Sequence, residues 1–262
     1  MSIFGRQRRF TSPSIPSLEA PLPPVSQLPE TSAPELFQVV GPGASQIVTF
    51  GGRPSLFTTL SREPSIATVD GFLSPGEIRM LRILAFGRMH RSKVAGKNYR
   101  TKSGFQSSVR TSSSTGIAKG KNSIVRKIEA RISQLCGLPS EHIEPLTITR
   151  YRPGEFYGPH VDWFPSKGRN ADFVRKSGGQ RVATVLVYLN DPKAGETGAG
   201  TFFPKLDLRI EPKKGRALIW QNVDSSQKPL DLTVHEGEPP ELGTKFIVTA
   251  WVREHPYKRV KR

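Results

Sequence analysis

Hydrophobic and polar positions divide the chain into a helical part followed by a β-rich part. Ser74, Pro75 and Glu77 have the order of an N-cap, a first helical residue and a capping-box acid, and an apolar stripe beginning at Ile78 follows them. This pattern predicts a helix from residue 75 to about residue 87. A second helix is predicted from residue 122 or 123 to about residue 136, with one apolar face and Gly137 as its stop signal.

From residue 143 onward the apolar residues gather in short runs that are typical of β-strands. The runs are rich in β-branched and aromatic residues, are bounded by Gly, Pro, Asn or Asp, and lie at 146–151, 181–189, 217–220, 232–234 and 246–252. Because no helical pattern separates them, they indicate a sandwich or jelly roll. We therefore predict a mostly β fold of the α+β class, with N-terminal helices packed on a β-sandwich.

Proline dominates the first part of the chain. Ten prolines lie within residues 1–64, and proline blocks helices and disfavours central strands because it lacks the N–H group and fixes φ. We predict a flexible or polyproline-like leader over 1–64, in which residues 46–60 only weakly indicate one or two strands. The folded domain is predicted over 65–256, and a basic tail over 257–262.

Composition and charge exclude some classes of protein. The 262 residues carry 39 Lys and Arg against 22 Asp and Glu, a formal net charge of +17. Cys136 is the single cysteine, so a disulfide framework and a Cys-rich zinc site are excluded. Residues 88–131 hold twelve basic residues and one acidic residue, and the segment after Tyr257 holds four basic residues, so these two segments carry nearly all of the excess. The remainder of the β-rich half is close to neutral.

Three interpretations of the basic segment 88–131 stay open at this point. The default interpretation is a solvated face around a loop. The other two are a groove that attracts an acidic protein substrate and a surface that binds nucleic acid. Apart from Tyr99 and Phe105, the segment lacks the interleaved aromatic residues that stack on single-stranded bases.

The N-terminus has no apolar core of a secretory signal, and the chain has no stretch of about 18 apolar residues that could cross a bilayer. Arg6, Arg8 and Arg9 among hydroxyl residues, with no acid before Glu19, fit an organellar transit peptide and a disordered tail equally well. A cytoplasmic or an organellar location is therefore expected, and the choice stays open.

Candidate metal ligands stand out among the polar residues. His160 and Asp162 are two residues apart, and in an extended segment residues at this spacing point to the same side. His235 follows the run 232–234 and can supply a third ligand from across the sandwich. Two imidazoles and one carboxylate on one face of an octahedron form a non-haem iron(II) site with open positions.

Lys245 begins an apolar strand ten residues after His235, where a lysine should be exposed unless it has an anionic partner. A dicarboxylate cosubstrate can supply that partner, with its other end on the metal.

The sequence resembles the prolyl 4-hydroxylase branch of the 2-oxoglutarate- and iron(II)-dependent dioxygenases over about residues 66–254. The matching runs, in family order, are Gly71-Phe-Leu-Ser, Val109-Arg-Thr-Ser-Ser, Glu144-Pro-Leu, Tyr151-Arg-Pro-Gly-Glu-Phe-Tyr-Gly-Pro-His-Val-Asp-Trp-Phe, Gly178-Gly-Gln-Arg-Val-Ala-Thr, Tyr188-Leu-Asn-Asp, Thr201-Phe-Phe-Pro, Pro212-Lys-Lys-Gly-Arg-Ala-Leu and His235-Glu-Gly-Glu-Pro-Pro. The resemblance implies a double-stranded β-helix core at about 143–254.

The resemblance also implies roles for particular residues. His160, Asp162 and His235 would hold iron(II), and Lys245 would bind the distal carboxylate of 2-oxoglutarate. Family residues near the cosubstrate match Tyr151 and Thr201, although an insertion leaves Thr197 as an alternative to Thr201. Family residues at the substrate groove match Arg181 and Trp251. L-ascorbate is implied as the reductant that rescues oxidised iron.

Departures from the family pattern bear on the substrate. The frequent cysteine pair, a secretory signal and an anchor are missing, which argues against the endoplasmic reticulum and collagen-like substrates. Nucleic-acid demethylases of this fold bind 2-oxoglutarate through an arginine shortly after the last histidine. Here Glu236, Glu238 and Glu241 occupy those positions, and Lys245 is the anchor.

The implied function is hydroxylation of peptidyl proline at C4, with release of succinate and CO₂, on a protein or peptide substrate. Two alternatives remain: the same chemistry on another protein side chain or a free amino acid, and a basic-face binding protein with a vestigial pocket. The sequence does not name the substrate or the oligomeric state.

Overall fold

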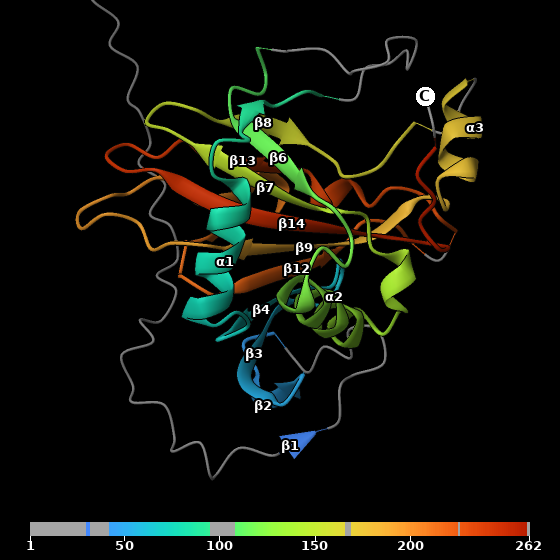
Figure 1. Ribbon diagram of the computed structural model, residues 1–262, viewed down its shortest axis with the longest axis horizontal. Coiled ribbons are helices and arrows are strands. Elements are labelled where there is room, and N and C mark those ends of the chain that lie inside the picture. Colours follow the sequence, from blue (N-terminus) through green and yellow to red (C-terminus); the bar gives the residue numbers. More distant parts are fainter. Residues whose placement is uncertain (1–29, 32–41, 95–107, 166–168, 225, 261–262) are drawn as a thin grey trace, which may run out of the picture.

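The structure is a computed structural model that describes residues 30–31, 42–94, 108–165, 169–224 and 226–260. Fourteen described strands form two sheets (Figure 1). In sheet order, the ten strands of the large sheet are β1 (Glu30–Thr31), β2 (Ser45–Phe50), β3 (Arg53–Ser61), β4 (Ile66–Asp70), β12 (Ala217–Gln221), β9 (Arg181–Tyr188), β14 (Lys245–Arg253), β7 (Leu146–Tyr151), β6 (Ser113–Ile117) and β5 (His90–Arg91).

The small sheet has four strands and carries most of the polar site residues described below. In sheet order they are β11 (Leu208–Ile210), β10 (Thr201–Phe203), β13 (His235–Gly237) and β8 (Tyr157–His160). Side chains from both sheets, among them Tyr188, Trp220 and Phe203, form one buried cluster. The two sheets therefore enclose a common interior, which is the jelly roll that the strand pattern predicts.

Three α-helices and three short 3-10 helices complete the described structure. They are α1 (Pro75–Ala85), α2 (Ser123–Cys136), α3 (Arg169–Lys176), η2 (Ser140–His142), η3 (Pro204–Leu206) and η4 (Asp231–Thr233). None of the helices in these ranges is long and apolar enough to cross a membrane.

Local end signals determine where the two predicted helices start and stop. The Ser74 hydroxyl accepts from the Glu77 N–H, while the Glu77 carboxylate accepts from the Ser74 N–H, which completes the capping box. The Asn122 side chain caps α2 by accepting from the Val125 N–H, and Gly137 ends this helix at φ 66°. Both helix predictions are confirmed.

Helices α1 and α2 cover the outer face of the large sheet (Figure 1). The second buried cluster joins apolar residues of both helices, such as Leu81 and Ile132, to Val185, Val248 and Val252 of the sheet. Burial of apolar side chains of this size stabilises the fold by about 1.5–3 kcal/mol each. The helix–sheet layer is therefore the main apolar core, and it leaves the opposite face of the same strands free for polar site residues.

The structure differs from the sequence predictions at three places. β2 and β3 lie within the leader predicted over 1–64, where residues 46–60 had weakly indicated one or two strands. They pair with one another, and β3 pairs with β4, so the large sheet extends upstream of residue 65. The run 232–234 is not a strand: Asp231–Thr233 forms η4, whose Thr233 hydroxyl donates to the Leu230 carbonyl, and β13 begins at His235. Helix α3 lies between the predicted strands 146–151 and 181–189, where no helical pattern was found. The transit-peptide alternative and most of the leader fall outside the described residues.

A buried ion cluster joins the start of the β-rich part to its end. The Glu144 carboxylate, on the segment before β7, accepts from Arg181 at 2.7 and 3.0 Å and from Arg253 at 2.7 Å. Glu144 and Arg253 are buried, and Arg253 also donates to the Gly179 carbonyl. Burial acts to raise the pKa of Glu144, but the two guanidinium groups outweigh it and the pKa is lowered.

We predict that Glu144→Ala destabilises the protein by about 3–5 kcal/mol, because it leaves two buried guanidinium groups without their carboxylate. Urea unfolding monitored by circular dichroism measures this. Because the folded-state pKa of Glu144 is lowered, its contribution is present above the unfolded pKa and is lost as the pH falls through the folded one. Asp172→Ala, which breaks the exposed pair with Arg175, is the control and should change the free energy of unfolding by less than about 0.5 kcal/mol. An equally small effect at Glu144 would contradict the prediction.

Candidate active site

Two strand ends bring the candidate metal ligands together. His160 is the last residue of β8 and His235 the first of β13, and the two are register partners across the small sheet. Asp162 follows β8 by two residues. The ligand atoms of the three side chains all lie within 4.8 Å of one another. The Nε2 atom of each histidine is 3.8 Å from a different Asp162 oxygen.

Backbone carbonyls orient both imidazole rings. His160 Nδ1 lies 2.9 Å from the Gly158 carbonyl, and His235 Nδ1 lies 2.9 Å from the Thr233 carbonyl. A carbonyl only accepts, so each Nδ1 carries a proton and Nε2, which faces Asp162, is the nitrogen available to a metal. Such carbonyl contacts fix the tautomer and ring orientation of histidines that bind metals.

Asp162 is held from the opposite side by a hydrogen-bonded chain. The Thr184 hydroxyl donates to Asp162 Oδ2 at 2.8 Å, and the Asn222 amide donates to the Thr184 oxygen at 2.9 Å. Burial acts to raise the pKa of Asp162, but His235, His160 and Arg181 lower it. The pKa of His160 is lowered, mainly by burial and next by the charge of His235. The carboxylate is thus ionised and His160 neutral, which are the forms that bind a metal.

The chemistry of this donor set fits iron(II). Two imidazoles and one carboxylate on neighbouring strand ends match the donor set of the facial triad of non-haem iron(II) oxygenases. The three side chains are mostly buried, with exposed fractions of 18% for His160, 7% for Asp162 and 6% for His235. They line one cavity, which opens beyond the triad towards the interior of the jelly roll.

A buried cation lies in the same cavity. Lys245, the first residue of β14, is 2% exposed and donates to the Gly200 carbonyl at 2.6 Å. Burial lowers its pKa to about 7, against the opposing pull of Glu238 and Glu211. Its ammonium lies 5.0 Å from the Tyr151 ring centre. Because an ammonium has three donors, the cavity holds a cation with hydrogen-bonding capacity for an anionic ligand.

Comparison with known proteins places this site in a family. Residues 146–253 match the model of the 2OG-Fe(II) oxygenase superfamily. In Arabidopsis thaliana, Probable prolyl 4-hydroxylase 10 is 34% identical over 220 residues, which cover 76% of this chain and 72% of that protein. Prolyl 4-hydroxylase 2 of the same plant is 34% identical over 229 residues, covering 79% and 73%. The chain belongs to the prolyl 4-hydroxylase family of 2-oxoglutarate- and iron(II)-dependent oxygenases.

A solved structure gives the same result for the fold. The viral collagen prolyl hydroxylase of Paramecium bursaria Chlorella virus-1, in its 2-oxoglutarate complex, is 27% identical and superposes with a TM-score of 0.56. The match covers 72% of this chain and 94% of the viral chain. The double-stranded β-helix and the enzyme class expected from the sequence are therefore confirmed, with iron(II) and 2-oxoglutarate as the cofactor and cosubstrate of the family.

Two further candidates for contact with the oxygenase cosubstrate lie beside Lys245. Tyr151 is the register partner of Lys245 and lines the cavity. A Cβ built on Gly237 would lie 3.1 Å from the Tyr151 oxygen, so the glycine makes room for this side chain. Thr201 is buried in the cavity and accepts from the Tyr188 hydroxyl at 2.8 Å, whereas Thr197 is exposed and donates to Glu241. Of the two threonines, only Thr201 lines the cavity.

The candidate substrate residues of the oxygenase lie on the other side of the triad. Trp251 lines the cavity, and the Arg181 guanidinium stacks on its ring at 3.9 Å. Arg181 Nη1 is 3.9 Å from Asp162, while its other nitrogens bond to Glu144. The ion cluster of the fold therefore fixes the position of Arg181 next to the metal ligands.

Sequence reasoning assigned no role to several residues that shape the oxygenase site. Tyr157 stacks on the His160 ring, with centroids 3.6 Å apart, and the Arg110 guanidinium lies 4.4 Å from the Tyr157 ring centre. Trp220 is buried, and its ring lies 4.6 Å from the His235 ring. Arg110 and Tyr157 lie inside motifs that carry the resemblance, which was the available signal. For Thr184, the only signal in the sequence was its place in such a motif.

We predict that Thr184→Val weakens metal binding about 10- to 100-fold, because it removes the hydroxyl that orients Asp162 and leaves the Asn222 amide without its acceptor. Competition of the protein with a fluorescent chelator for Mn(II), in anaerobic buffer, measures the affinity.

Thr197→Val is the matched control, because it removes the same hydroxyl from an exposed position, and it should leave the affinity unchanged. Equal affinities of the two variants would show that the chain from Asn222 to Asp162 does not support the metal site.

Proposed function

We propose that this protein hydroxylates peptidyl proline at C4 in a protein or peptide substrate. The observation that carries the proposal is the presence, in one cavity, of a buried two-histidine, one-carboxylate triad and a buried lysine, in a chain 34% identical to proteins named prolyl 4-hydroxylases. The intact triad and lysine do not favour a vestigial pocket. When bound, iron(II) and 2-oxoglutarate supply the oxidising chemistry, in which dioxygen is consumed, succinate and CO₂ are released and one oxygen atom enters a substrate C–H bond.

The proposal gives each candidate residue a task. His160, Asp162 and His235 hold the metal through two Nε2 atoms and one carboxylate. Lys245 pairs with the distal carboxylate of 2-oxoglutarate, and Tyr151 and Thr201 hydrogen-bond to the cosubstrate. Their burial supports these tasks, because charge pairing and hydrogen bonds are stronger where water is excluded.

Arg181 and Trp251 are proposed to contact the substrate. Support comes from the stacking of the guanidinium on the indole, from the 3.9 Å separation between Arg181 and Asp162, and from the position of Trp251 in the cavity wall. An aromatic wall next to the oxidising centre suits the apolar, hydrogen-bond-free face of a proline ring. L-ascorbate is proposed as the external reductant that restores iron(II), on the strength of the family resemblance alone.

The proline assignment is tested with a peptide library that contains proline in varied sequence contexts. Incubation with iron(II), 2-oxoglutarate and ascorbate should add one oxygen to proline, with formation of succinate, both detected by mass spectrometry. His235→Ala and Asp162→Ala should abolish both products because each removes a metal ligand. Oxygen found only on lysine, arginine or a nucleobase would overturn the substrate assignment while leaving the oxygenase class intact.

We predict that 2-oxoglutarate binding takes up about one proton per molecule at about pH 8 and almost none at about pH 6. The pKa of Lys245 is about 7 in the empty cavity, so the amine is largely neutral above this pH, and pairing with a carboxylate raises its pKa. The affinity should consequently fall about tenfold for each pH unit above 7. Calorimetric titration of the Mn(II)-loaded protein in buffers of different ionisation enthalpy measures the uptake.

Lys245→Met should lose the proton uptake and bind 2-oxoglutarate about a hundredfold more weakly, because a buried charge pair is lost. Lys193→Met, at an exposed position, is the control and should behave as the parent protein. Binding without proton uptake at about pH 8 would show that Lys245 does not pair with the cosubstrate.

A further inference from the structure

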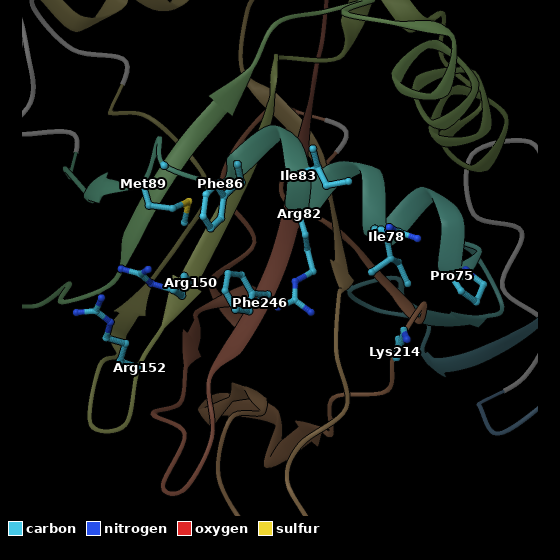
Figure 2. A pocket seen from close by; sticks show the side chains of 13 residues that line it. Pro75, Ile78, Arg82, Ile83, Phe86, Met89, Arg150, Arg152, Lys214 and Phe246 are labelled. Atoms are coloured by element: carbon cyan, nitrogen blue, oxygen red, sulfur yellow. The ribbon is translucent and has the colours of Figure 1, made fainter.

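A second cavity lies on the outer face of the large sheet, between α1 and the strands β7 and β14 (Figure 2). Its volume is about 760 Å³, within the range of sites that hold ligands or peptide segments. We call it the α1 groove. Its walls carry five cationic side chains and no acidic one: Arg79, Arg82, Arg150, Arg152 and Lys214.

The five cations share one hollow and have no carboxylate partner among the described residues. No ion pair joins any of the five to a described acidic residue, whereas Arg131, Arg209 and Arg216, for example, each pair with one. Within the same ranges, Arg150 Nε is buried and has no hydrogen-bond acceptor. The α1 groove therefore presents positive charge that the described part of the protein does not neutralise.

Apolar side chains lie between these cations. Phe86 is 87% exposed and Ile83 is 56% exposed, both at the end of α1 that faces the groove. Figure 2 shows Phe246 between Arg150 and Arg82, and the Arg82 guanidinium lies 4.8 Å from the Phe246 ring centre. Exposed aromatic and aliphatic side chains gathered in one hollow are typical of a surface that binds another molecule.

The α1 groove is separate from the active site, although the two share strands. Lys245 pairs in register with Tyr151, and the next pair is Phe246 with Arg150. Because successive side chains of a strand point to opposite faces, the first pair faces the active-site cavity and the second faces the α1 groove. A ligand in the groove is therefore not the 2-oxoglutarate of the proposed reaction.

The charge of the chain argues against its own segments as the occupant. Residues 1–41 contain three Arg and three Glu; the three Glu follow the last Arg, but Glu30 pairs with Ile47 of β2, at the other end of the large sheet from β7 and β14. Residues 95–107 contain three cations and no acid. A second copy carries the same net charge of +17. An acidic occupant must therefore come from another molecule.

We propose that the α1 groove binds a segment of a partner protein in which acidic residues alternate with bulky apolar ones. Carboxylates of the segment pair with Arg79, Arg152 and Lys214, and its apolar side chains pack on Phe86 and Phe246. A nucleic acid would satisfy the cations but would leave the aliphatic part of the groove exposed to water, so the mixed lining favours a peptide. The proposal goes beyond the oxygenase activity and does not depend on it.

The test uses the full-length protein and a short, proline-free, fluorescein-labelled peptide in which Glu and Asp alternate with Leu and Phe. Fluorescence anisotropy should show binding that weakens as salt is raised, because exposed ion pairs are screened. Arg152→Glu combined with Lys214→Glu should weaken binding roughly tenfold or more, since attraction becomes repulsion at two exposed positions. Phe86→Ser should also weaken binding.

Matched controls separate the groove from the general positive charge of the protein. Lys121→Glu combined with Lys127→Glu makes the same charge change at exposed positions near and in α2, and Leu242→Ser removes an exposed apolar side chain elsewhere. Both controls should bind the acidic peptide as the parent does. A peptide with Gln and Asn in place of its acids, and one with Ser in place of Leu and Phe, should bind weakly.

Several outcomes would overturn the proposal. Equal losses in the groove variants and the controls would assign the binding to net charge. Tighter binding of a single-stranded oligonucleotide than of the peptide, lost in the groove variants, would assign the groove to nucleic acid. A concentration-dependent dimer in sedimentation, abolished by Phe86→Ser, would assign it to a second copy. Turnover of 2-oxoglutarate at the parent rate in the groove variants shows that they fold, so failure here is distinguishable from failure of the proposed function.

Discussion

Successive side chains of a strand point to opposite faces of a sheet, and the two central strands β14 and β9 place different chemistry on each face. On β14, Lys245, Ile247 and Trp251 point into the jelly roll, where they meet the site or the inner cluster, whereas Val248 and Val252 point outwards to the helices. A register slip by one residue would exchange the two sets and bury valines in the site. The apolar outer face fixes the register, and the register in turn positions the polar residues of the active site.

Keeping charged groups inside the jelly roll requires partners for each of them. Glu144 satisfies Arg181 and Arg253 together, and Arg181 in turn stacks on Trp251 beside the candidate metal ligands. Asp162 has Thr184 as its donor, so the carboxylate is fixed before any metal binds. Lys245 is the exception, because its ammonium has a single described acceptor and its pKa is lowered towards neutrality by burial. Lys245 is therefore the residue expected to bind an anionic ligand, since a buried charge without a partner is costly.

Features with a local signal could be predicted from the sequence. The caps at Ser74 and Gly137 set the ends of α1 and α2, and the strand runs and the spacing of His160 and Asp162 gave the jelly roll and the candidate ligands. Features that depend on contacts between distant segments could not. Glu144 meets Arg253 across 109 positions of sequence, and the strands β2 and β3, only weakly indicated among the prolines, pair with β4 as part of the large sheet. The run before His235 is apolar enough for a strand, but its hydroxyl and carbonyl groups bond locally as η4.

The net positive charge has a different meaning once its positions in space are known. In the sequence, the cations concentrate at 88–131, but the α1 groove takes its five from α1, from β7 and the turn after it, and from the loop before β12, so no single run of sequence revealed them. Inside the jelly roll, Arg181 and Arg253 are held by a buried carboxylate and are tied to the structure of the site. Outside it, Arg150 and Phe246 lie one residue from Tyr151 and Lys245 but line the α1 groove, whose walls carry no acidic residue. The neighbouring strands β9, β14 and β7 thus carry paired charge on the side of the active site and unpaired charge on the side of the α1 groove, where another molecule can bind.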